Sequence, residues 1–135
     1  MFIEERLQTL SNILKEMRDS TMDRRKELKA LYKNMKPDMG IFIIRSNFNN
    51  KCYIEGTQDL KGTINSTKFK LNFGNHPNKA LQKEWKEHGE ESFIIEILEN
   101  LKYDKDESKT DYSEELAILK MVWEEKLSKE GMEFY

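Results

Sequence analysis

Apolar residues in the first quarter of the chain recur at alternating spacings of four and three. The series contains two polar positions, Thr21 and Arg24, and otherwise consists of Ile3, Leu7, Leu10, Leu14, Met17, Leu28, Leu31 and Met35. This heptad spacing predicts one bent helix or two helices that meet near residue 20, and Pro37 ends the element. The stripe packs either on the rest of the chain or on a second copy, and the second alternative predicts a homodimer through the N-terminal helices.

The pattern changes after residue 37. Apolar and β-branched runs at 40–46 and 51–56, separated by Asn47-Phe48-Asn49-Asn50, predict a tight hairpin. A third strand is expected at 93–98, where isoleucines follow Phe93. The charged stretch 102–111 predicts a loop. The elements predict an α+β fold, a small sheet of about three strands flanked by helices.

Three helices are expected around this sheet. The first runs from 60 to 73 between an Asp59 cap and Gly74. The second begins at Pro77 and ends at Gly89, and the third begins with Ser113 as its cap and ends near Gly131. On the second helix, Ala80, Leu81, Trp85 and His88 are expected on one side. On the third, the side chains expected to face inward are Leu116, Leu119, Trp123 and Leu127.

Composition predicts a small intracellular protein. With 135 residues the chain accommodates one domain, at 38–135, and a helical extension, at 1–37. It has neither a long apolar run nor a signal-peptide pattern, and its single cysteine, Cys52, allows no internal disulfide. These features predict a cytoplasmic protein without a membrane partner.

The charge is unevenly distributed along the chain. Residues 37–88 hold eight Lys and Arg against five Asp and Glu, whereas residues 89–135 hold six against fourteen. A phosphate-bearing partner is therefore expected at the hairpin and the segment that follows it.

The hairpin carries a recognisable motif, Gly40-Ile41-Phe42 followed after ten residues by Tyr53-Ile54. Further matching pieces follow in order: Asn75-His76-Pro77-Asn78, Leu81-Gln82, Trp85, His88-Gly89 and the run Phe93 to Leu98. Together they resemble the GIY-YIG nuclease family, including phage-intron homing endonuclease domains and bacterial members, over roughly residues 38–128.

The resemblance implies a cleft that cleaves phosphodiesters, with two tyrosines, an arginine, histidines and a metal-binding glutamate. Here Phe42 replaces the first tyrosine, Tyr53 and His76 are kept, and Glu55 replaces a glycine. Counted without gaps, the arginine position falls on Thr63 and a histidine position on Thr67. The metal-binding glutamate falls on Lys120, although Glu124, one turn later, is an alternative. Arginine to threonine removes a phosphate clamp, and lysine in place of glutamate repels Mg²⁺.

Three functions remain open. The first is a pseudonuclease that binds nucleic acid in the former active-site cleft without cofactor or metal. The second is a binding protein for a nucleotide or another phosphate-bearing small ligand. The third is a weak metal-dependent endonuclease whose residual catalytic candidates are Tyr53, His76 and Glu124. The candidate ligand-binding residues are Phe42, Tyr53, Lys61, Lys68, His76, Asn78 and Lys120.

Overall fold

The computed structural model describes residues 24–28 and 36–135. The chain separates into two units, Met1–Lys36 and Pro37–Tyr135. In the first unit, residues 24–28 are helical, and Arg24 forms an ion pair with Glu27 at 2.8 Å. Most of the heptad series lies outside the described residues, so the homodimer through it stays a prediction.

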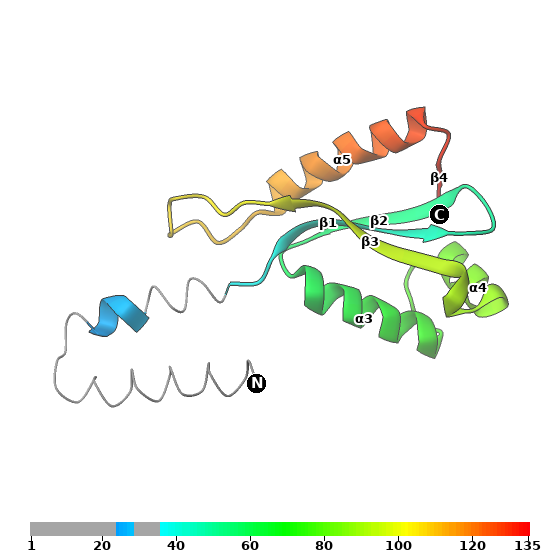
Figure 1. Ribbon diagram of the computed structural model, residues 1–135, viewed down its shortest axis with the longest axis horizontal. Coiled ribbons are helices and arrows are strands. Elements are labelled where there is room, and N and C mark those ends of the chain that lie inside the picture. The colour runs from blue at the N-terminus through cyan, green and yellow to red at the C-terminus, as the bar shows by residue number, and fades with distance from the viewer. Residues whose placement is uncertain (1–23, 29–35) are drawn as a thin grey trace. The chain divides into compact units, whose positions relative to one another are not determined.

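The second unit contains four strands and three α-helices (Figure 1). In chain order they are β1 (Met39–Ser46), β2 (Lys51–Thr57), α3 (Leu60–Phe73), α4 (Lys79–His88), the 3-10 turn η1 (Glu90–Ser92), β3 (Phe93–Leu101), α5 (Ser113–Lys129) and β4 (Glu133–Phe134). The predicted α+β class is confirmed. None of the helices in the described part of the chain has the length and apolar character needed to cross a bilayer.

The four strands form one mixed sheet in the order β3-β1-β2-β4. Strand β1 pairs antiparallel with both β2 and β3, whereas β4 runs parallel to β2. The expectation of about three strands therefore missed β4. A two-residue strand carries no periodicity, and it exists only because the chain returns to pair Glu133 with Lys51 and Phe134 with Cys52.

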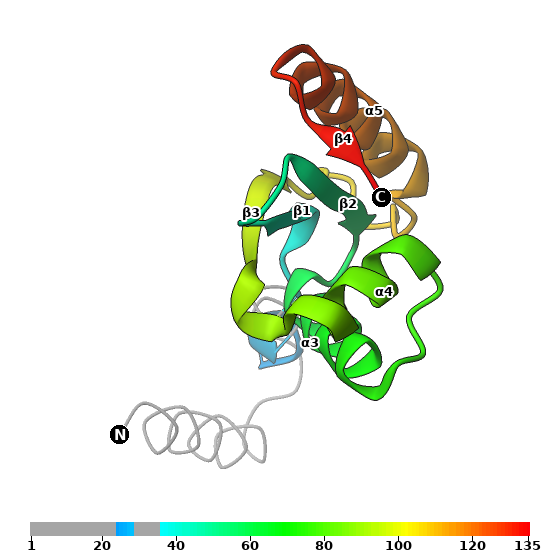
Figure 2. The same cartoon turned by 90° about the vertical axis from the view of Figure 1, so that its right-hand side faces the viewer.

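Each face of the sheet has its own core, and β1 contributes to both. Side chains alternate along a strand, so Phe42 and Ile44 point to one face and Ile41 and Ile43 to the other. Helices α3 and α4 cover the first face and α5 the second (Figure 2). Tyr53 packs against the same cluster as Phe42, so these two rings lie on one face of the sheet.

Helix α3 begins and ends as predicted. Asp59 accepts a hydrogen bond from the backbone of Gly62 at 3.0 Å, and Gly74 closes the helix with φ of 82°. A Cβ on Gly62 would lie 2.2 Å from the Asp59 carboxylate, so this cap requires glycine there.

The starts of the other two helices were predicted wrongly. Asn78, not a first-turn Pro77, is the N-cap of α4, because its side-chain oxygen accepts from Leu81 at 3.1 Å. Ser113 is the first residue of α5 rather than its cap, and it donates to Asp111.

The stripes expected on α4 and α5 differ in burial. On α4, Leu81 and Trp85 are buried, but Ala80 and His88 are exposed, and His88 stacks on Phe48 with ring centroids 3.9 Å apart. His88 reaches only the hairpin tip because it lies in the last turn of the helix. On α5, the inward stripe is as expected, with Leu116 and Leu127 buried and Leu119 and Trp123 partly buried.

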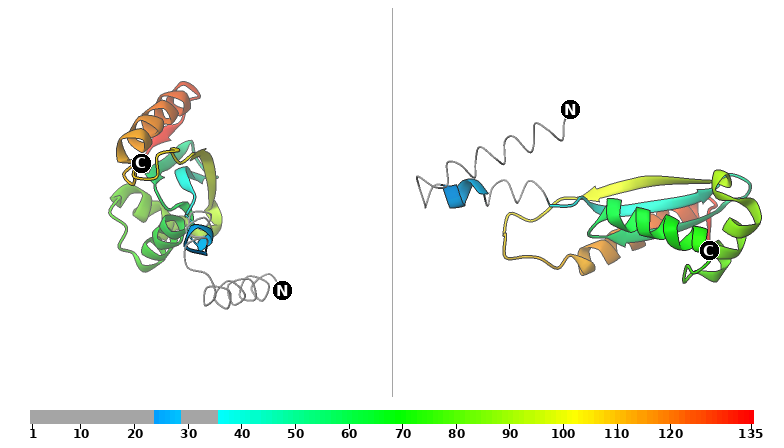
Figure 3. Two further views of the ribbon diagram at one scale, coloured as in Figure 1. Left: turned by 90° about the vertical axis from the view of Figure 1, so that its left-hand side faces the viewer. Right: turned by 90° about the horizontal axis from the view of Figure 1, so that it is seen from below.

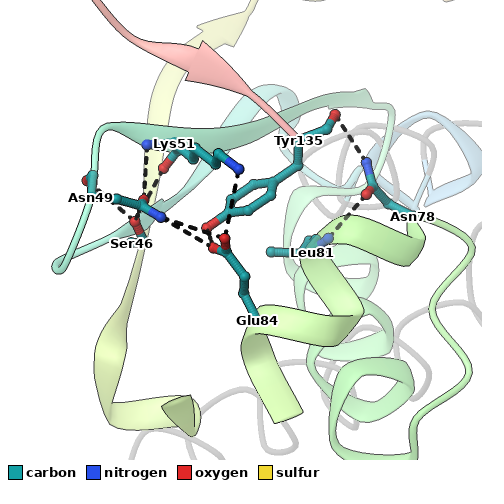
Figure 4. Close-up of polar contacts among 7 residues, drawn as sticks. All are labelled: Ser46, Asn49, Lys51, Asn78, Leu81, Glu84 and Tyr135. Carbon is teal, nitrogen blue, oxygen red and sulfur yellow. Dashed lines mark hydrogen bonds and ion pairs between the residues drawn. The ribbon is translucent and has the colours of Figure 1, made fainter. Parts of the chain in front are cut away.

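A polar network joins the hairpin to α4 (Figure 4). Glu84 accepts hydrogen bonds from Asn49 at 3.3 Å and from the Tyr135 hydroxyl, and pairs with Lys51 at 3.8 Å. The Tyr135 carbonyl accepts from the Asn78 side chain at 3.3 Å. These contacts hold the hairpin, the last residues and α4 together beside Tyr53.

Candidate functional site

A polar cleft of about 360 Å³ lies between the end of β2, helix α3 and the segment that leads into α4. Helix α3 runs alongside the strands of the sheet (Figure 3). The lining residues are Glu55, Asp59, Gly62, Thr63, Ser66, Thr67, Lys70, His76 and Pro77. Two carboxylates, one ammonium and several hydroxyls thus face the same space.

Tyr53 and Glu55 form the polar pair at the β2 side of the cleft. They are two residues apart on one strand and therefore point to the same face. The Tyr53 hydroxyl donates to the Glu55 carboxylate at 2.6 Å. Burial, this hydrogen bond and the negative charge of Glu55 all raise the pKa of Tyr53 above its ordinary value. The phenol therefore stays protonated and acts as a donor.

His76 is held from both sides by the backbone and by α4. Its Nδ1 accepts from the Asn78 backbone N–H at 3.0 Å, and its own backbone N–H donates to Gln82 at 3.0 Å. Its ring meets Tyr53 edge-on with centroids 5.3 Å apart. Burial lowers the pKa of His76, against the opposing effect of Glu55. The imidazole is thus neutral near pH 7, with its proton on Nε2.

Thr63 and Thr67, which the gap-free count predicts at the family's arginine and histidine positions, both line the cleft. Thr63 shares a 2.6 Å hydrogen bond with Thr57 on β2, and Thr67 is buried. The gap-free alignment therefore brings both positions into one cleft with His76. A neutral hydroxyl, however, offers no charge to a phosphate.

Other predicted ligand-binding residues do not line the cleft. Phe42 has no exposed surface, because it lies on a central strand under α3 and α4. Asn78 caps α4 and bonds to Tyr135. Lys61 and Lys68 are on α3, but neither is among the residues that line the cleft.

The structure places Lys70 in the cleft, which the sequence analysis did not propose. Helical periodicity explains the difference. Gly62, Ser66 and Lys70 are successive four-residue steps, as are Thr63 and Thr67, so they share one side of α3. The spacing is present in the sequence. Which side of α3 faces the sheet follows only from the burial of Leu60, Thr67 and Leu71.

Lys120 and Glu124 lie on α5, which packs on the other core cluster from the one that contains Phe42. Their charged groups are 3.9 Å apart, and both side chains are 42% exposed. Neither residue lines the polar cleft. Their roles as a ligand-binding cation and a residual catalytic carboxylate stay predictions.

The family resemblance implies one divalent metal held by a single glutamate, and the sequence comparison puts Lys120 at that position. Within residues 24–28 and 36–135, no three His, Cys, Asp or Glu side chains are grouped so that they could hold an ion. In the cleft, Glu55 accepts from Tyr53 and Asp59 caps α3. No step of a mechanism is therefore assigned to a metal.

Charge differs between the segment that carries α3 and α4 and the segment that follows it. Residues 59–89, which form α3 and α4, contain six lysines and three carboxylates. Residues 89–135, which contribute β3 and α5, contain six lysines and fourteen carboxylates. The predicted basic character after the hairpin therefore corresponds to the α3–α4 layer.

Solved structures provide the similarity to known proteins. The catalytic domain of the homing endonuclease I-TevI matches with a TM-score of 0.54 and 27% identity, over 67% of this chain and 88% of that chain. A point mutant of the same catalytic domain matches at 30% identity with a TM-score of 0.45, over 59% of this chain and 84% of that chain. Neither the family models nor the curated proteins give a match.

Proposed function

The chain belongs to the GIY-YIG nuclease family, and on that basis we propose that its domain binds nucleic acid at the α3–α4 side of the sheet without cleaving it. The composition of the cleft carries this proposal. Thr63 and Thr67 stand where the family has a phosphate-binding arginine and a histidine. The remaining tyrosine hydroxyl, on Tyr53, is already bonded to Glu55.

Phosphodiester hydrolysis needs an activated water and positive charge near the phosphorus atom. Beside this cleft Tyr53 is a protonated donor with a raised pKa, and two carboxylates, Glu55 and Asp59, line the cleft with a single ammonium, Lys70. Loss of one well-placed electrostatic contact typically slows an enzyme by about 10²–10³-fold. The replacements at the arginine and first tyrosine positions therefore argue against efficient cleavage.

Binding needs less than cleavage, because lysines near a phosphate backbone supply most of a sequence-independent affinity. The α3–α4 layer has this charge excess, and Lys70 extends it to the cleft edge. The acidic stretch that contributes α5 would repel a polyanion. We therefore orient the nucleic acid toward α3 and α4.

The test measures binding and cleavage together on plasmid DNA, single-stranded DNA and RNA, with and without Mg²⁺ or Mn²⁺. We expect salt-dependent binding without strand breaks. Lys70→Gln should flatten the plot of log K against log salt by roughly 0.7–0.9. Lys129→Gln on α5 removes the same charge from the acidic side and should change the slope little.

Three outcomes contradict the proposal. The absence of binding to every nucleic acid rejects it directly. Equal effects of Lys70→Gln and Lys129→Gln reject the orientation. Metal-dependent cleavage that Glu124→Ala abolishes would establish the weak endonuclease instead. Lys120→Gln, measured alongside, tests whether that ammonium contributes to binding.

A nucleotide-sized ligand is the second candidate, and the volume of the cleft favours it. About 360 Å³ lies within the usual range of small-ligand pockets, and hydroxyls of Thr63 and Ser66 face it beside Lys70. Acid denaturation of the purified protein followed by mass spectrometry would detect a retained nucleotide. Its presence in the unmodified protein and its loss in Lys70→Gln would favour this function over nucleic-acid binding.

A further inference from the structure

Two phenylalanines on α3 are exposed although they are large and apolar. Phe69 is 60% exposed and Phe73 is 70% exposed. Their rings stack on each other with centroids 4.3 Å apart and an interplanar angle of 27°. Neither ring belongs to either core cluster, so packing of the domain does not account for them.

The phenylalanine pair borders the polar cleft along the same helix. Ser66 and Lys70 line the cleft, and Phe69 and Phe73 follow them by three residues each. Residues three apart are neighbours on a helix surface. The aromatic rings and the cleft therefore occupy adjoining parts of one helix surface, where Lys70 is the neighbour of Phe73 three residues on, and Lys68 precedes Phe69 in the chain.

A second exposed apolar surface, on α5, adjoins two carboxylates that are each paired with a lysine. Ile118, Met121 and Val122 line a groove there together with Glu124 and Glu125. That groove has no aromatic residue and is flanked by carboxylates. The α3 surface combines aromatic rings with ammonium groups, which complement the planar bases and anionic backbone of a nucleic acid.

We propose that Phe69 and Phe73 stack unpaired nucleobases while Lys68 and Lys70 bind the adjoining phosphates. The inference rests on the proposed nucleic-acid binding and deepens it by naming the ligand as single-stranded. In a duplex both faces of each base are already stacked on neighbouring bases, so the rings have nothing to contact. Single strands present free base faces, and stacking accepts every base.

The test uses fluorescence anisotropy of the full chain with a labelled oligo(dT) strand and with the same strand annealed to oligo(dA). Phe69→Ala and Phe73→Ala should each weaken binding to oligo(dT) roughly five- to hundredfold. The slope of affinity against salt should stay unchanged, because no charge is lost. Lys70→Gln should flatten that slope. Binding to the annealed duplex should be weaker and insensitive to the phenylalanine variants.

Two controls separate stacking from loss of apolar area or of folding. Phe73→Leu keeps an apolar side chain without a planar ring and should bind nearly as weakly as Phe73→Ala. Met121→Ala removes an equally exposed apolar side chain from α5 and should leave affinity unchanged. Because both rings are exposed, thermal unfolding of all variants should match the unmodified protein.

The outcomes distinguish this inference from the proposed function. Binding that the phenylalanine variants do not weaken overturns the stacking surface and leaves nucleic-acid binding intact. Equal weakening on single strand and duplex also overturns it. A lower mass in light scattering for Phe69→Ala would assign the pair to a contact between copies of the chain. If the unmodified protein binds neither probe, both the inference and the proposed function fail.

Discussion

Removing the hydrogen bond between Tyr53 and Glu55 should show what holds the remaining tyrosine of the cleft. Tyr53→Phe deletes the donor, whereas Glu55→Gln keeps an acceptor of the same shape without its charge. The double variant completes a cycle that isolates the pair. Because both residues lie on β2 and face one side, neither substitution should disturb the strand.

The expected coupling follows from the geometry of the contact. The two oxygens are 2.6 Å apart, and both residues are partly buried. Hydrogen bonds to a charged partner contribute about 1.5–3 kcal/mol. Because both side chains are partly exposed to solvent, we expect a smaller coupling here, about 1–2 kcal/mol. Glu55→Gln removes the negative charge, one of the three causes that raise the pKa of Tyr53, and leaves a hydrogen bond to a neutral acceptor. The phenol should then titrate at lower pH, with burial and the remaining hydrogen bond holding its pKa above the ordinary range.

Urea denaturation of the four proteins measures the free energies of unfolding, and ultraviolet absorbance follows tyrosinate formation. Tyr53→Phe combined with Glu84→Gln is the control pair, since Glu84 bonds to Tyr135 instead, and these two effects should add. A Tyr53–Glu55 coupling below about 0.3 kcal/mol, together with an unchanged Tyr53 titration, would refute the reasoning.

Three further measurements test other parts of the molecule. Burial lowers the pKa of His76 in the folded protein, so the unfolded chain binds a proton at a higher pH than the folded chain does. The free energy of unfolding should therefore fall as pH drops below about 6.5. His76→Gln should flatten this dependence, and an unchanged pH profile would contradict it. Asp59→Ala should cost about 1 kcal/mol through loss of the α3 cap, and an equal loss in Asp38→Ala would show that charge alone matters. Light scattering should report twice the 16.1 kDa monomer, and charged residues at Leu7, Leu10 and Leu14 should halve it, whereas a monomer at high concentration excludes the predicted dimer.

The hairpin and α3 could be predicted because their determinants are local. Turn residues separate two β-branched runs, and Asp59 lies three residues before the amide that it caps. The start of α4 was missed for a related reason. Pro77 and Asn78 both suit a helix start. Helix α4 begins after Asn78, because the Leu81 backbone N–H donates to the Asn78 side chain.

The position of each side chain in the cleft was less predictable than the element that carries it. Lys61 and Lys68 were predicted as ligand-binding cations, but Lys70 is the lysine that lines the cleft. Successive side chains of a helix point about 100° apart around its axis. Which lysine faces the cleft therefore depends on how α3 is rotated about its axis relative to the sheet. Burial of Leu60 and Leu71 sets that rotation.

The fold class and the hairpin motif follow from residue identity and local spacing, and the replacement of family residues at Phe42, Thr63 and Thr67 is a prediction from the same information. Only the tertiary structure decided that β4 joins the sheet, that Phe42 is buried, and that Lys120 and Glu124 lie on a helix against the other face. Each of these depends on contacts between segments far apart in the chain. Their geometry follows from the packing of two cores around one central strand, which no local pattern encodes.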